Sequence, residues 1–381
     1  MPAAIVRPRV IRGNGYLGWV GETGGVPAQT AWVLHVDLDQ FIAAVEVLRR
    51  PELAGLPVVV GGDGDPTKRG VVATATYEAR KFGVQSGVPL RTAARRCPDA
   101  VFLPVDRDAY EEASEKVMAT LRGLDAVVEV MGWDEAFLAV ETDDPREYAR
   151  RVQALVRDAT RLECTVGIGE NKLQAKLATG FGKPAGVFTI TDDTWFDVLG
   201  DRTTDALWGI GARTAKRLAA LDIHTVRELA GTDPRRLAER VGPTTGPWLV
   251  RLAGGRDRSP VVSAPYVARG RSREHTFQRN LEEWDEVRRE VASLARQVAG
   301  DIAAQQRLTV RVVTKVRFAP FLTHTHGQAL PSPTADPDEI ERAALAALEK
   351  FTQRRPVRLL GVRAEIVMPG TETPPEQEAP E

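Results

Sequence analysis

Three carboxylates lie inside apolar stretches of this chain, where acidic side chains are unusual. Asp37 belongs to "AWVLHVDL" (31–38), and Asp134 and Glu135 belong to "VVEVMGWDEAFLAVE" (127–141). Both stretches have the composition of buried strands, and buried carboxylates without partners are costly and repel one another. Neither stretch contains a lysine or arginine. A divalent cation, which takes oxygen ligands, would resolve the conflict.

Such a carboxylate set suits phosphoryl or nucleotidyl transfer. Mg²⁺ keeps one or two carboxylates and takes its other ligands from substrate phosphates. Two ions about 3.5–4 Å apart hold the attacking and leaving oxygens of an in-line displacement. A salt bridge or a capped turn is the alternative for the three residues. Asp39 shares a strand face with Asp37, but a hydrogen bond to neighbouring backbone explains it equally well.

The elements that must position these residues alternate between strands and helices in the first half of the chain. Besides the two stretches above, the apolar patterns predict strands at 56–62 and 164–169, helices at 109–124 and 146–162, and a strand running into a helix at 70–83. This alternation indicates an α/β sheet carrying helices.

The second half changes texture near residue 191, where short helices are separated by glycine turns. "GIGARTAKRL" (209–218) is the clearest of these, and "GGRDRSPVVSAP" (254–265) has the composition of an exposed linker. Strand and helix patterns then return over about a hundred residues and indicate a second α/β module.

Composition limits the class of protein. The 381 residues are 43% hydrophobic and 27% charged, with a net charge of −1, and no apolar run is long enough to span a membrane. Two distant cysteines argue against a disulfide framework and favour the reducing cytoplasm. The charge is uneven, because four arginines and one glutamate lie in 266–279, whereas 370–381 has four glutamates and no basic residue. A local basic patch can bind phosphates even when the net charge is near zero.

Five motifs together resemble one family. "HVDLDQFIAAVE", "VVATATYEARKFGV", "GWDEAFL", "TVGIGENKLQAKLATGFGKPAGV" and "LWGIGARTAKRL" occur in the order and spacing of the Y-family translesion DNA polymerases, nearest to the DinB, or DNA polymerase IV, branch. The resemblance runs from Trp32 to Val367. It implies a right-hand fold that is α/β (α+β) in the palm. The implied parts are an N-terminal extension (1–30), palm (31–41 and 106–190), fingers (42–105), thumb with a helix-hairpin-helix (191–257), linker (258–268), α/β little finger (269–368) and a disordered acidic tail (369–381).

The resemblance also implies residue roles. Asp37, Asp134, Glu135 and the carbonyl of Leu38 would be the ligands of two Mg²⁺ ions, or of Mn²⁺ ions in their place, with Glu135 as the catalytic acidic residue. A primer 3′-hydroxyl would attack the α-phosphate of an incoming nucleotide and release pyrophosphate. The triphosphate would be held by residues matching the family's phosphate ligands, namely Thr74, Tyr77, Arg80 and Lys183.

Duplex contacts are implied for the C-terminal half. Gly209 and Gly211 would let the hairpin approach a phosphate, and a turn that merely ends a helix is the alternative. Arg271 and Arg273, on the first strand of the little finger, would lie along the DNA backbone, so that affinity falls steeply with salt. We expect a monomer that binds primer-template DNA and nucleoside triphosphates and has no membrane partner.

One position departs from the family. The sixth residue counted from Asp37, usually Tyr or Phe, is Ile42 here, next to Phe41. In the family the aromatic ring at this position blocks a ribose 2′-hydroxyl. A β-branched aliphatic side chain reaches less far, so we expect ribonucleotides to be accepted as well as deoxyribonucleotides. The alternative is that Ile42 only packs and another residue excludes the hydroxyl.

Other departures concern the surroundings. Small residues in 70–75 and 86–89 predict a roomy roof over the new base pair, hence low fidelity and bypass of damaged bases. Trp133 is expected to pack without chemistry. The tail lacks an apolar anchor, which predicts weak or absent sliding-clamp binding through it. The competing classes are a non-catalytic DNA-binding relative acting as an assembly platform, and a nucleotide cyclase with a similar carboxylate geometry.

Overall fold

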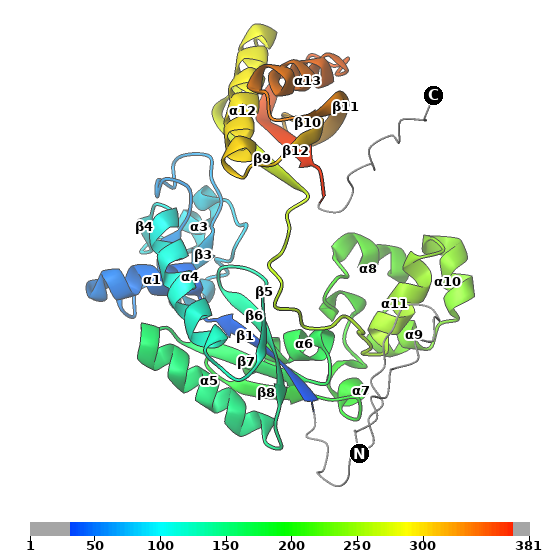
Figure 1. Ribbon diagram of the computed structural model, residues 1–381. Coiled ribbons are helices and arrows are strands. Elements are labelled where there is room, and N and C mark those ends of the chain that lie inside the picture. Colours follow the sequence, from blue (N-terminus) through cyan, green and yellow to red (C-terminus); the bar gives the residue numbers. More distant parts are fainter. Residues whose placement is uncertain (1–30, 369–381) are drawn as a thin grey trace, which may run out of the picture.

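A five-stranded sheet carries the acidic residues at its centre (Figure 1). The computed structural model describes residues 31–368, so the predictions for 1–30 and 369–381 lie outside the described residues. The strand order is β5-β6-β1-β7-β8. The strands are β1 (Ala31–Leu38), β5 (Val127–Val130), β6 (Glu135–Glu141), β7 (Cys164–Gly169) and β8 (Val187–Ile190). All neighbouring pairs are antiparallel except β7 and β8.

The single long strand expected over 127–141 is wrong. The stretch forms a hairpin of β5 and β6, and Asp134 lies in its turn just before β6. The backbone N–H groups of Met131 and Gly132 both donate to the carbonyl of Glu135, which closes the turn. An unbroken apolar alternation does not reveal such a reversal, since each arm keeps the same period.

The palm sheet separates two environments because strand side chains alternate between its faces. Leu34, Val36 and Leu38 of β1 join the palm core together with residues of α4 (Arg107–Arg122) and α5 (Pro145–Thr160). The intervening His35 and Asp37 therefore face the opposite side. There His35 bonds Thr179 of α6 (Lys172–Gly182), so that α6 covers this second face. Both cysteines are free and buried, in agreement with the expected absence of a disulfide framework.

The fingers form a small body on the palm. Their sheet has the order β3-β2-β4, and Val58 and Val60 of β2 point into the palm core while Val59 points into the fingers core. The elements are β2 (Val58–Val60), β3 (Thr74–Ala75), β4 (Val101–Leu103), α2 (Tyr77–Arg80), α3 (Leu90–Arg96) and the 3-10 turn at Pro51–Leu53. Helix α1 (Phe41–Arg49) links this body to β1 and packs on β2 and β3.

Short helices form the thumb, as the glycine-punctuated sequence predicts. They are α7 (Trp195–Leu199), α8 (Ala212–Ala219), α9 (Val226–Ala230), α10 (Pro234–Val241) and α11 (Thr245–Ala253), with a 3-10 turn at Thr204–Ala206. Their core continues into α6 through Leu173 and Ala178.

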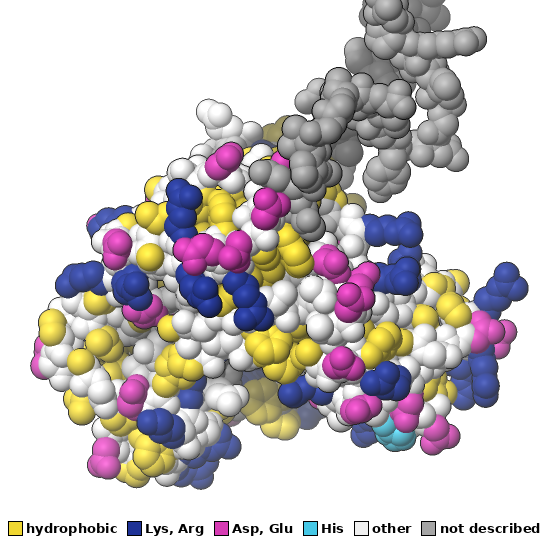
Figure 2. Space-filling model, turned by 90° about the horizontal axis from the view of Figure 1, so that it is seen from below, with side chains coloured by type: hydrophobic (Ala, Val, Ile, Leu, Met, Phe, Trp, Pro, Cys, Tyr) yellow, Lys and Arg dark blue, Asp and Glu magenta, His cyan; other side chains and the backbone are white. Residues whose placement is uncertain are grey.

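On the face of the molecule seen from below, acidic and basic side chains are interspersed without a continuous basic band (Figure 2).

An extended connector leads from the thumb to the little finger (Figure 1). The connector is fastened to the palm, because Asn171 donates to the Gly255 carbonyl at 2.9 Å and the Val262 N–H donates to Glu129 at 2.9 Å. Glu129 is in turn ion-paired with Lys172.

The little finger is a four-stranded sheet covered on one face by two helices, with the strand order β11-β10-β12-β9. Its elements are β9 (Gly270–Leu281), α12 (Trp284–Ala304), β10 (Thr309–Phe318), β11 (Leu322–Thr334), α13 (Pro337–Glu349) and β12 (Val357–Ile366). Within residues 31–368, even the longest helix lacks the combination of length and apolar character that crossing a bilayer requires.

Candidate active site

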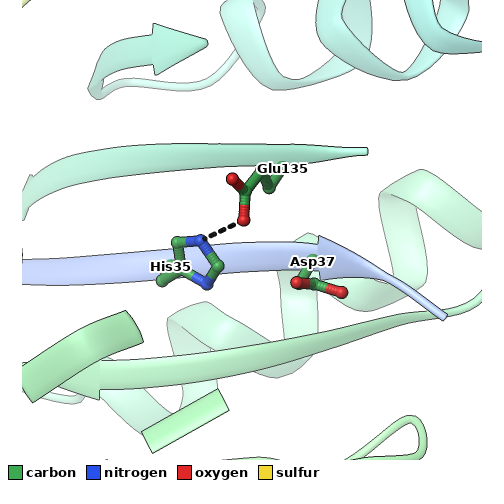
Figure 3. Close-up of side chains that lie close together, drawn as sticks. All are labelled: His35, Asp37 and Glu135. Atoms are coloured by element: carbon green, nitrogen blue, oxygen red, sulfur yellow. Dashed lines mark ion pairs between the residues drawn. The ribbon is translucent and has the colours of Figure 1, made fainter. Parts of the chain in front are cut away.

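Asp37 and Glu135 lie directly opposite each other on neighbouring strands, and His35 completes a cluster with them (Figure 3). One ligand atom from each of the three lies within 4.8 Å of the others. Nε2 of the buried His35 is 3.2 Å from Oε2 of Glu135. Burial lowers the pKa of His35, so the neutral imidazole donates to the carboxylate. This hydrogen bond, opposed by burial and assisted by Lys176, lowers the pKa of Glu135 to about 2.

Two lysines form ion pairs with Asp37 and Glu135. The stretches that contain these carboxylates have no lysine or arginine, so the sequence pattern did not predict the pairs. Lys183, just after α6, forms an ion pair with Asp37. Lys176 of α6 forms one with Glu135, and its ammonium is also 3.3 Å from His35 Nε2. Neither β1 nor β6 contributes these positive charges. They come from α6 and from the residue that follows it, and α6 packs on β1.

Asp134 is placed beside this cluster by the hairpin turn. The N–H of Leu38 donates to the Asp134 carbonyl at 2.8 Å, which ties the end of β1 to the turn. Burial raises the pKa of Asp134, and the charges of Asp37 and Glu135 raise it further, while Lys183 opposes them. Of the three acidic residues, Asp134 is therefore the one whose negative charge the neighbouring lysines neutralise least.

The donor set fits divalent cations that prefer oxygen ligands. The carboxyl groups of Asp37 and Glu135 converge. Their negative charges add to desolvation in raising the pKa of the neighbouring Asp134. The ammonium groups of Lys176 and Lys183 partly neutralise Glu135 and Asp37. A bound cation would do so more completely, because it draws several oxygens at once.

Tyr77 and Arg80 stand on the short helix α2, on the same side of the fingers as β3. The guanidinium of Arg80 lies 5.1 Å from the centre of the Tyr77 ring, and its Nε donates to the Ala75 carbonyl at 2.9 Å. The Tyr77 N–H donates to Oε1 of Gln40 at 2.6 Å, which joins α2 to the turn between β1 and α1. Thr74 lies on β3, half-buried.

Asp39 organises the surroundings of the cluster and is not one of its members. Its carboxylate is only 4% exposed and accepts hydrogen bonds from three elements. The donors are the Tyr77 hydroxyl (2.7 Å), the Thr165 hydroxyl (3.0 Å) and the Ala185 N–H (2.8 Å). Asp39 is hydrogen-bonded, but the expected partner, the neighbouring backbone, is wrong: two donors are side-chain hydroxyls, and all three are distant in sequence. Burial and the bond to Asp39 raise the pKa of Tyr77, so its hydroxyl stays protonated.

Changing Asp39 to Asn is expected to raise the KM for the incoming nucleotide more than it lowers kcat. An amide keeps the size but can accept with only one oxygen, so at least one of the three donors loses its partner, at a cost of about 1–3 kcal/mol. Steady-state kinetics and thermal melting measure the two effects. A double variant with Tyr77→Phe tests whether Asp39 acts through Tyr77. If the changes in KM of the two single variants simply add, Asp39 does not act through Tyr77.

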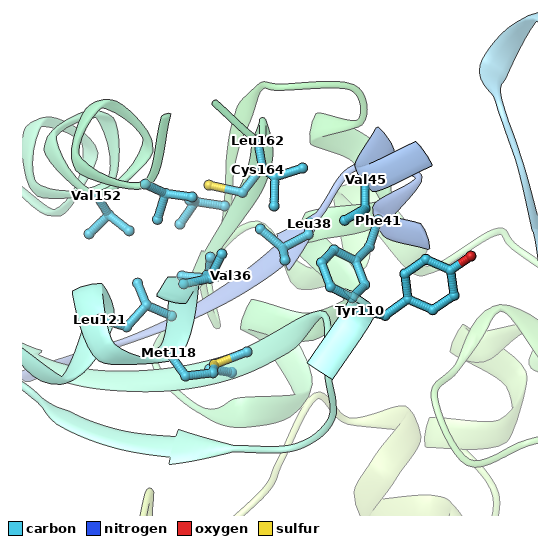
Figure 4. Packing of buried hydrophobic residues seen from close by; sticks show 14 of the residues in the cluster. Val36, Leu38, Phe41, Val45, Tyr110, Met118, Leu121, Val152, Leu162 and Cys164 are labelled. Carbon is cyan, nitrogen blue, oxygen red and sulfur yellow. The ribbon is translucent and has the colours of Figure 1, made fainter. Parts of the chain in front are cut away.

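Ile42 and Phe41 open helix α1, and the structure gives them different surroundings. Phe41 is 3% exposed and packs with Leu38, Val45 and Tyr110 in the palm core (Figure 4). Ile42 is half-buried and only borders that core. Helix α1 itself contacts β2 and β3 of the fingers, so Ile42 stands on the element that joins the palm to the fingers.

The residues expected to contact the DNA backbone differ in backbone conformation, in exposure and in ion pairing. Gly209 has a φ of +102°, and a side chain there would meet the Trp248 ring at 3.1 Å, while Gly211 is the N-cap residue of α8. Arg271 is exposed on β9. Arg273 makes a two-pronged ion pair with Asp301 of α12 at 2.7 Å, so its charge is already neutralised within the little finger.

His35 and Lys176 were missed by sequence reasoning. His35 was detectable, since it lies two residues before Asp37 and shares its strand face. Lys176 had a weaker signal in its spacing of four from Lys172 on one helix, and nothing in the sequence placed that helix across β1. Trp133 is half-buried against the palm core, with the guanidinium of Arg107 4.9 Å from its ring, as expected for a packing residue.

Comparisons with known proteins bear on this fold and site. The model of the impB/mucB/samB family matches residues 36–180, and that of the family's C-terminal domain matches residues 269–377. DNA polymerase IV 2 of Mycobacterium tuberculosis (strain ATCC 25618 / H37Rv) is 51% identical over 89% of this chain and 99% of its own length. DNA polymerase IV 2 of Methanosarcina mazei is 38% identical over 87% of this chain and 90% of its own length.

Solved protein structures also superpose on this chain. A Y-family DNA polymerase chimera, Dbh-Dpo4(243-245)-Dbh, superposes with a TM-score of 0.78 at 26% identity, covering 88% of this chain and 99% of the other. The insertion ternary complex of Dbh DNA polymerase superposes with a TM-score of 0.62 at the same identity and coverage. Palm, fingers, thumb and little finger around converging carboxylates define a right-hand DNA polymerase. The chain belongs to the Y-family DNA polymerases, in the DNA polymerase IV (DinB) branch, and is a DNA-directed DNA polymerase.

Proposed function

We propose that this polymerase performs two-metal nucleotidyl transfer for low-fidelity translesion synthesis and that it accepts ribonucleoside as well as deoxyribonucleoside triphosphates. The observation that carries the first part is the convergence of Asp37 and Glu135, paired across β1 and β6, beside Asp134, which is exposed in the hairpin turn. The second part rests on Ile42, which stands where relatives usually have an aromatic residue.

The carboxylates of Asp37, Asp134 and Glu135, with the carbonyl of Leu38, would hold two Mg²⁺ or Mn²⁺ ions. When bound, such ions neutralise phosphate charge and activate the attacking hydroxyl. His35 keeps Glu135 ionised and oriented through its hydrogen bond. Desolvation and then the charges of Asp37 and Glu135 raise the pKa of Asp134, so cationic charge entering the site would favour its ionised form.

The triphosphate would be bound from the fingers and from the end of α6. Tyr77 would turn its single O–H from Asp39 to a phosphate oxygen, Arg80 offers guanidinium nitrogens, and Thr74 adds a second hydroxyl. Lys183 would exchange Asp37 for a phosphate oxygen, which frees the aspartate for a cation. The shared hydrogen bonds to Asp39 keep Tyr77 and the segment after Lys183 in fixed relation before the nucleotide arrives.

The other assignments follow the family architecture. We assign residues 31–41 and 106–190 to the palm, 42–105 to the fingers, 191–257 to the thumb, 258–268 to the linker and 269–368 to the little finger. The turn with Gly209 and Gly211 would contact a backbone phosphate, and the exposed Arg271 is better placed for DNA than the paired Arg273. We also propose a monomer without tail-mediated clamp binding.

Primer extension on a labelled primer-template tests the proposal. We expect extension dictated by the template base, with dNTPs and also with rNTPs, in Mg²⁺ or Mn²⁺ and none in a chelator. The Asp134→Ala variant should bind the same DNA without extending it. Binding without extension by the wild-type protein would favour the non-catalytic platform instead. Extension with dNTPs alone would leave the metal chemistry standing and remove the relaxed sugar selection.

A further inference from the structure

Lys176 occupies an oxygen of the carboxylate cluster that a metal ion could use. Lys176 and His35 both donate to the same atom, Oε2 of Glu135, as Figure 3 shows for His35. A divalent cation that binds this oxygen must therefore displace one of the two donors. Because the ammonium of Lys176 is a positive charge already in place at Glu135, it competes with the metal ion for the same carboxylate.

His35 is held more firmly than Lys176. Its side chain is only 1% exposed, and its second ring nitrogen, Nδ1, lies 2.9 Å from the Thr179 hydroxyl of α6. The Phe137 ring packs against the imidazole, with 4.7 Å between the ring centres. Lys176, by contrast, is half-buried and carries its ammonium on a flexible four-carbon stem. A cation that binds Oε2 of Glu135 would therefore displace Lys176.

The ring of Trp208, from the thumb, is a further partner of the Lys176 ammonium. Nζ lies 5.3 Å from the centre of this ring, within the range of a cation–π interaction, for which tryptophan is the best aromatic partner. The centre of the Trp208 ring is also 6.3 Å from that of Phe137. Within residues 31–368, the apolar cores do not include Trp208. Packing in those cores therefore does not explain its position.

Trp208 brings the thumb into contact with a site that is otherwise built from the palm. It directly precedes Gly209 in the turn that leads into α8, whereas Glu135 and Lys176 belong to β6 and α6. The ammonium thus has the carboxylate and the ring as partners at the same time. A ring that attracts the ammonium in this place stabilises the ion pair between Lys176 and Glu135.

We propose that Lys176, held by Trp208, is a resident counter-charge that lowers the affinity of the carboxylate cluster for a divalent cation. Trp208 is a positioning residue in this role, because it acts on Glu135 only through Lys176. The inference rests on the proposed function, since it assumes that the cluster binds such cations. Its consequence is that the metal ion enters mainly together with a nucleotide, whose phosphates add the oxygen ligands that displace the lysine.

Mn²⁺ binding to the full-length protein without DNA or nucleotide tests the proposal and needs no catalysis. Electron paramagnetic resonance measures the free Mn²⁺, and the binding that Asp37→Asn abolishes is assigned to the carboxylate cluster. Lys176→Met removes the competing charge, and Lys176→Arg keeps it. Trp208→Leu removes the ring, and Trp208→Phe keeps an aromatic ring. A double variant combines Lys176→Met with Trp208→Leu.

Two matched controls make the same kinds of change away from the site. Lys116→Met removes an exposed lysine of α4 that forms an ion pair with Glu112. Trp284→Leu removes a tryptophan of the little finger whose ring centre lies 4.0 Å from the guanidinium of Arg354. Both controls should bind Mn²⁺ as the wild-type protein does.

Lys176→Met should bind Mn²⁺ about tenfold more tightly than the wild-type protein, because the competing charge is gone. Trp208→Leu should tighten binding by about threefold, since the lost cation–π attraction loosens Lys176. Lys176→Arg and Trp208→Phe should stay closer to wild type than the variants that lose the charge or the ring. The double variant should bind no more tightly than Lys176→Met alone. Trp208 is 40% exposed, so its variants test the proposal even if Lys176→Met destabilises the palm.

The proposal is overturned if Lys176→Met and Trp208→Leu bind Mn²⁺ no more tightly than the wild-type protein, or if Lys116→Met gains as much as Lys176→Met. Additive gains in the double variant would show that Trp208 does not act through Lys176. Primer extension by the wild-type protein separates this failure from that of the proposed function. A protein that extends primers while its variants bind Mn²⁺ with unchanged affinity contradicts only the role of Lys176 and Trp208. A protein that extends no primer contradicts the proposed chemistry.

Discussion

The Glu135→Gln variant is expected to extend a primer at least about a thousandfold more slowly than the wild-type protein. Glutamine keeps the size of the side chain but removes the negative charge that His35 and Lys176 hold in place. Stabilisation of transition-state charge by metal ions contributes several kcal/mol, and each 1.4 kcal/mol is about tenfold in rate. Single-turnover extension at saturating nucleotide measures this step without product release.

Glu141→Gln is the matched control for this variant. Glu141 ends the same strand, is exposed, and stands outside the carboxylate cluster. Its variant should extend primers at the wild-type rate. DNA binding and melting temperature should stay close to wild type in both, so that a slow Glu135→Gln protein is not simply unfolded. Equal extension rates for the two variants would remove Glu135 from the chemistry.

The Ile42→Phe variant is expected to prefer dNTPs over rNTPs by about a hundredfold more than the wild-type protein does. The half-buried Ile42 only borders the palm core, so a larger ring meets fewer packed neighbours there than at the buried Phe41. A site without room for an added hydroxyl rejects it by steric clash, worth roughly 1–3 kcal/mol or somewhat more. The ratio of kcat/KM values for each dNTP and its rNTP gives the discrimination directly.

Ile42→Leu serves as the control, since it conserves volume and apolar character. It should discriminate as the wild-type protein does. The dNTP efficiency of Ile42→Phe should change little, because the ring would meet only the 2′-hydroxyl. If the phenylalanine variant and the wild-type protein have the same dNTP-to-rNTP ratio, another residue sets sugar selection and Ile42 only packs.

Much of the fold followed from local patterns. Alternation along β1 was enough to place Asp37 on one face with Leu38 on the other. Glycine turns marked the thumb, and the return of strand and helix periods marked the little finger, because these features depend on neighbouring residues. The family motifs then indicated the order of palm, fingers, thumb and little finger along the chain, which the periodicity of apolar residues alone does not indicate.

What failed depended on contacts between distant residues. The hairpin at Asp134 keeps one apolar period through both arms, so the reversal left no mark in the pattern. The pairing of Lys176 with Glu135 spans 41 positions, and that of Lys183 with Asp37 spans 146. Both depend on how α6 crosses the sheet. The partners of Asp39 arise likewise from packing between separate elements.

The anchoring of the connector at Gly255 and Val262 shortens the tether between the palm and the little finger. Only about seven residues separate the second anchor from β9, which reach at most about 25 Å when extended. A little finger that released the hydrogen bonds of Arg69 to Phe277 and Asn280 would therefore stay within about that distance of the palm. Rebinding is then an intramolecular event at high effective concentration, and its rate does not depend on how much protein is present.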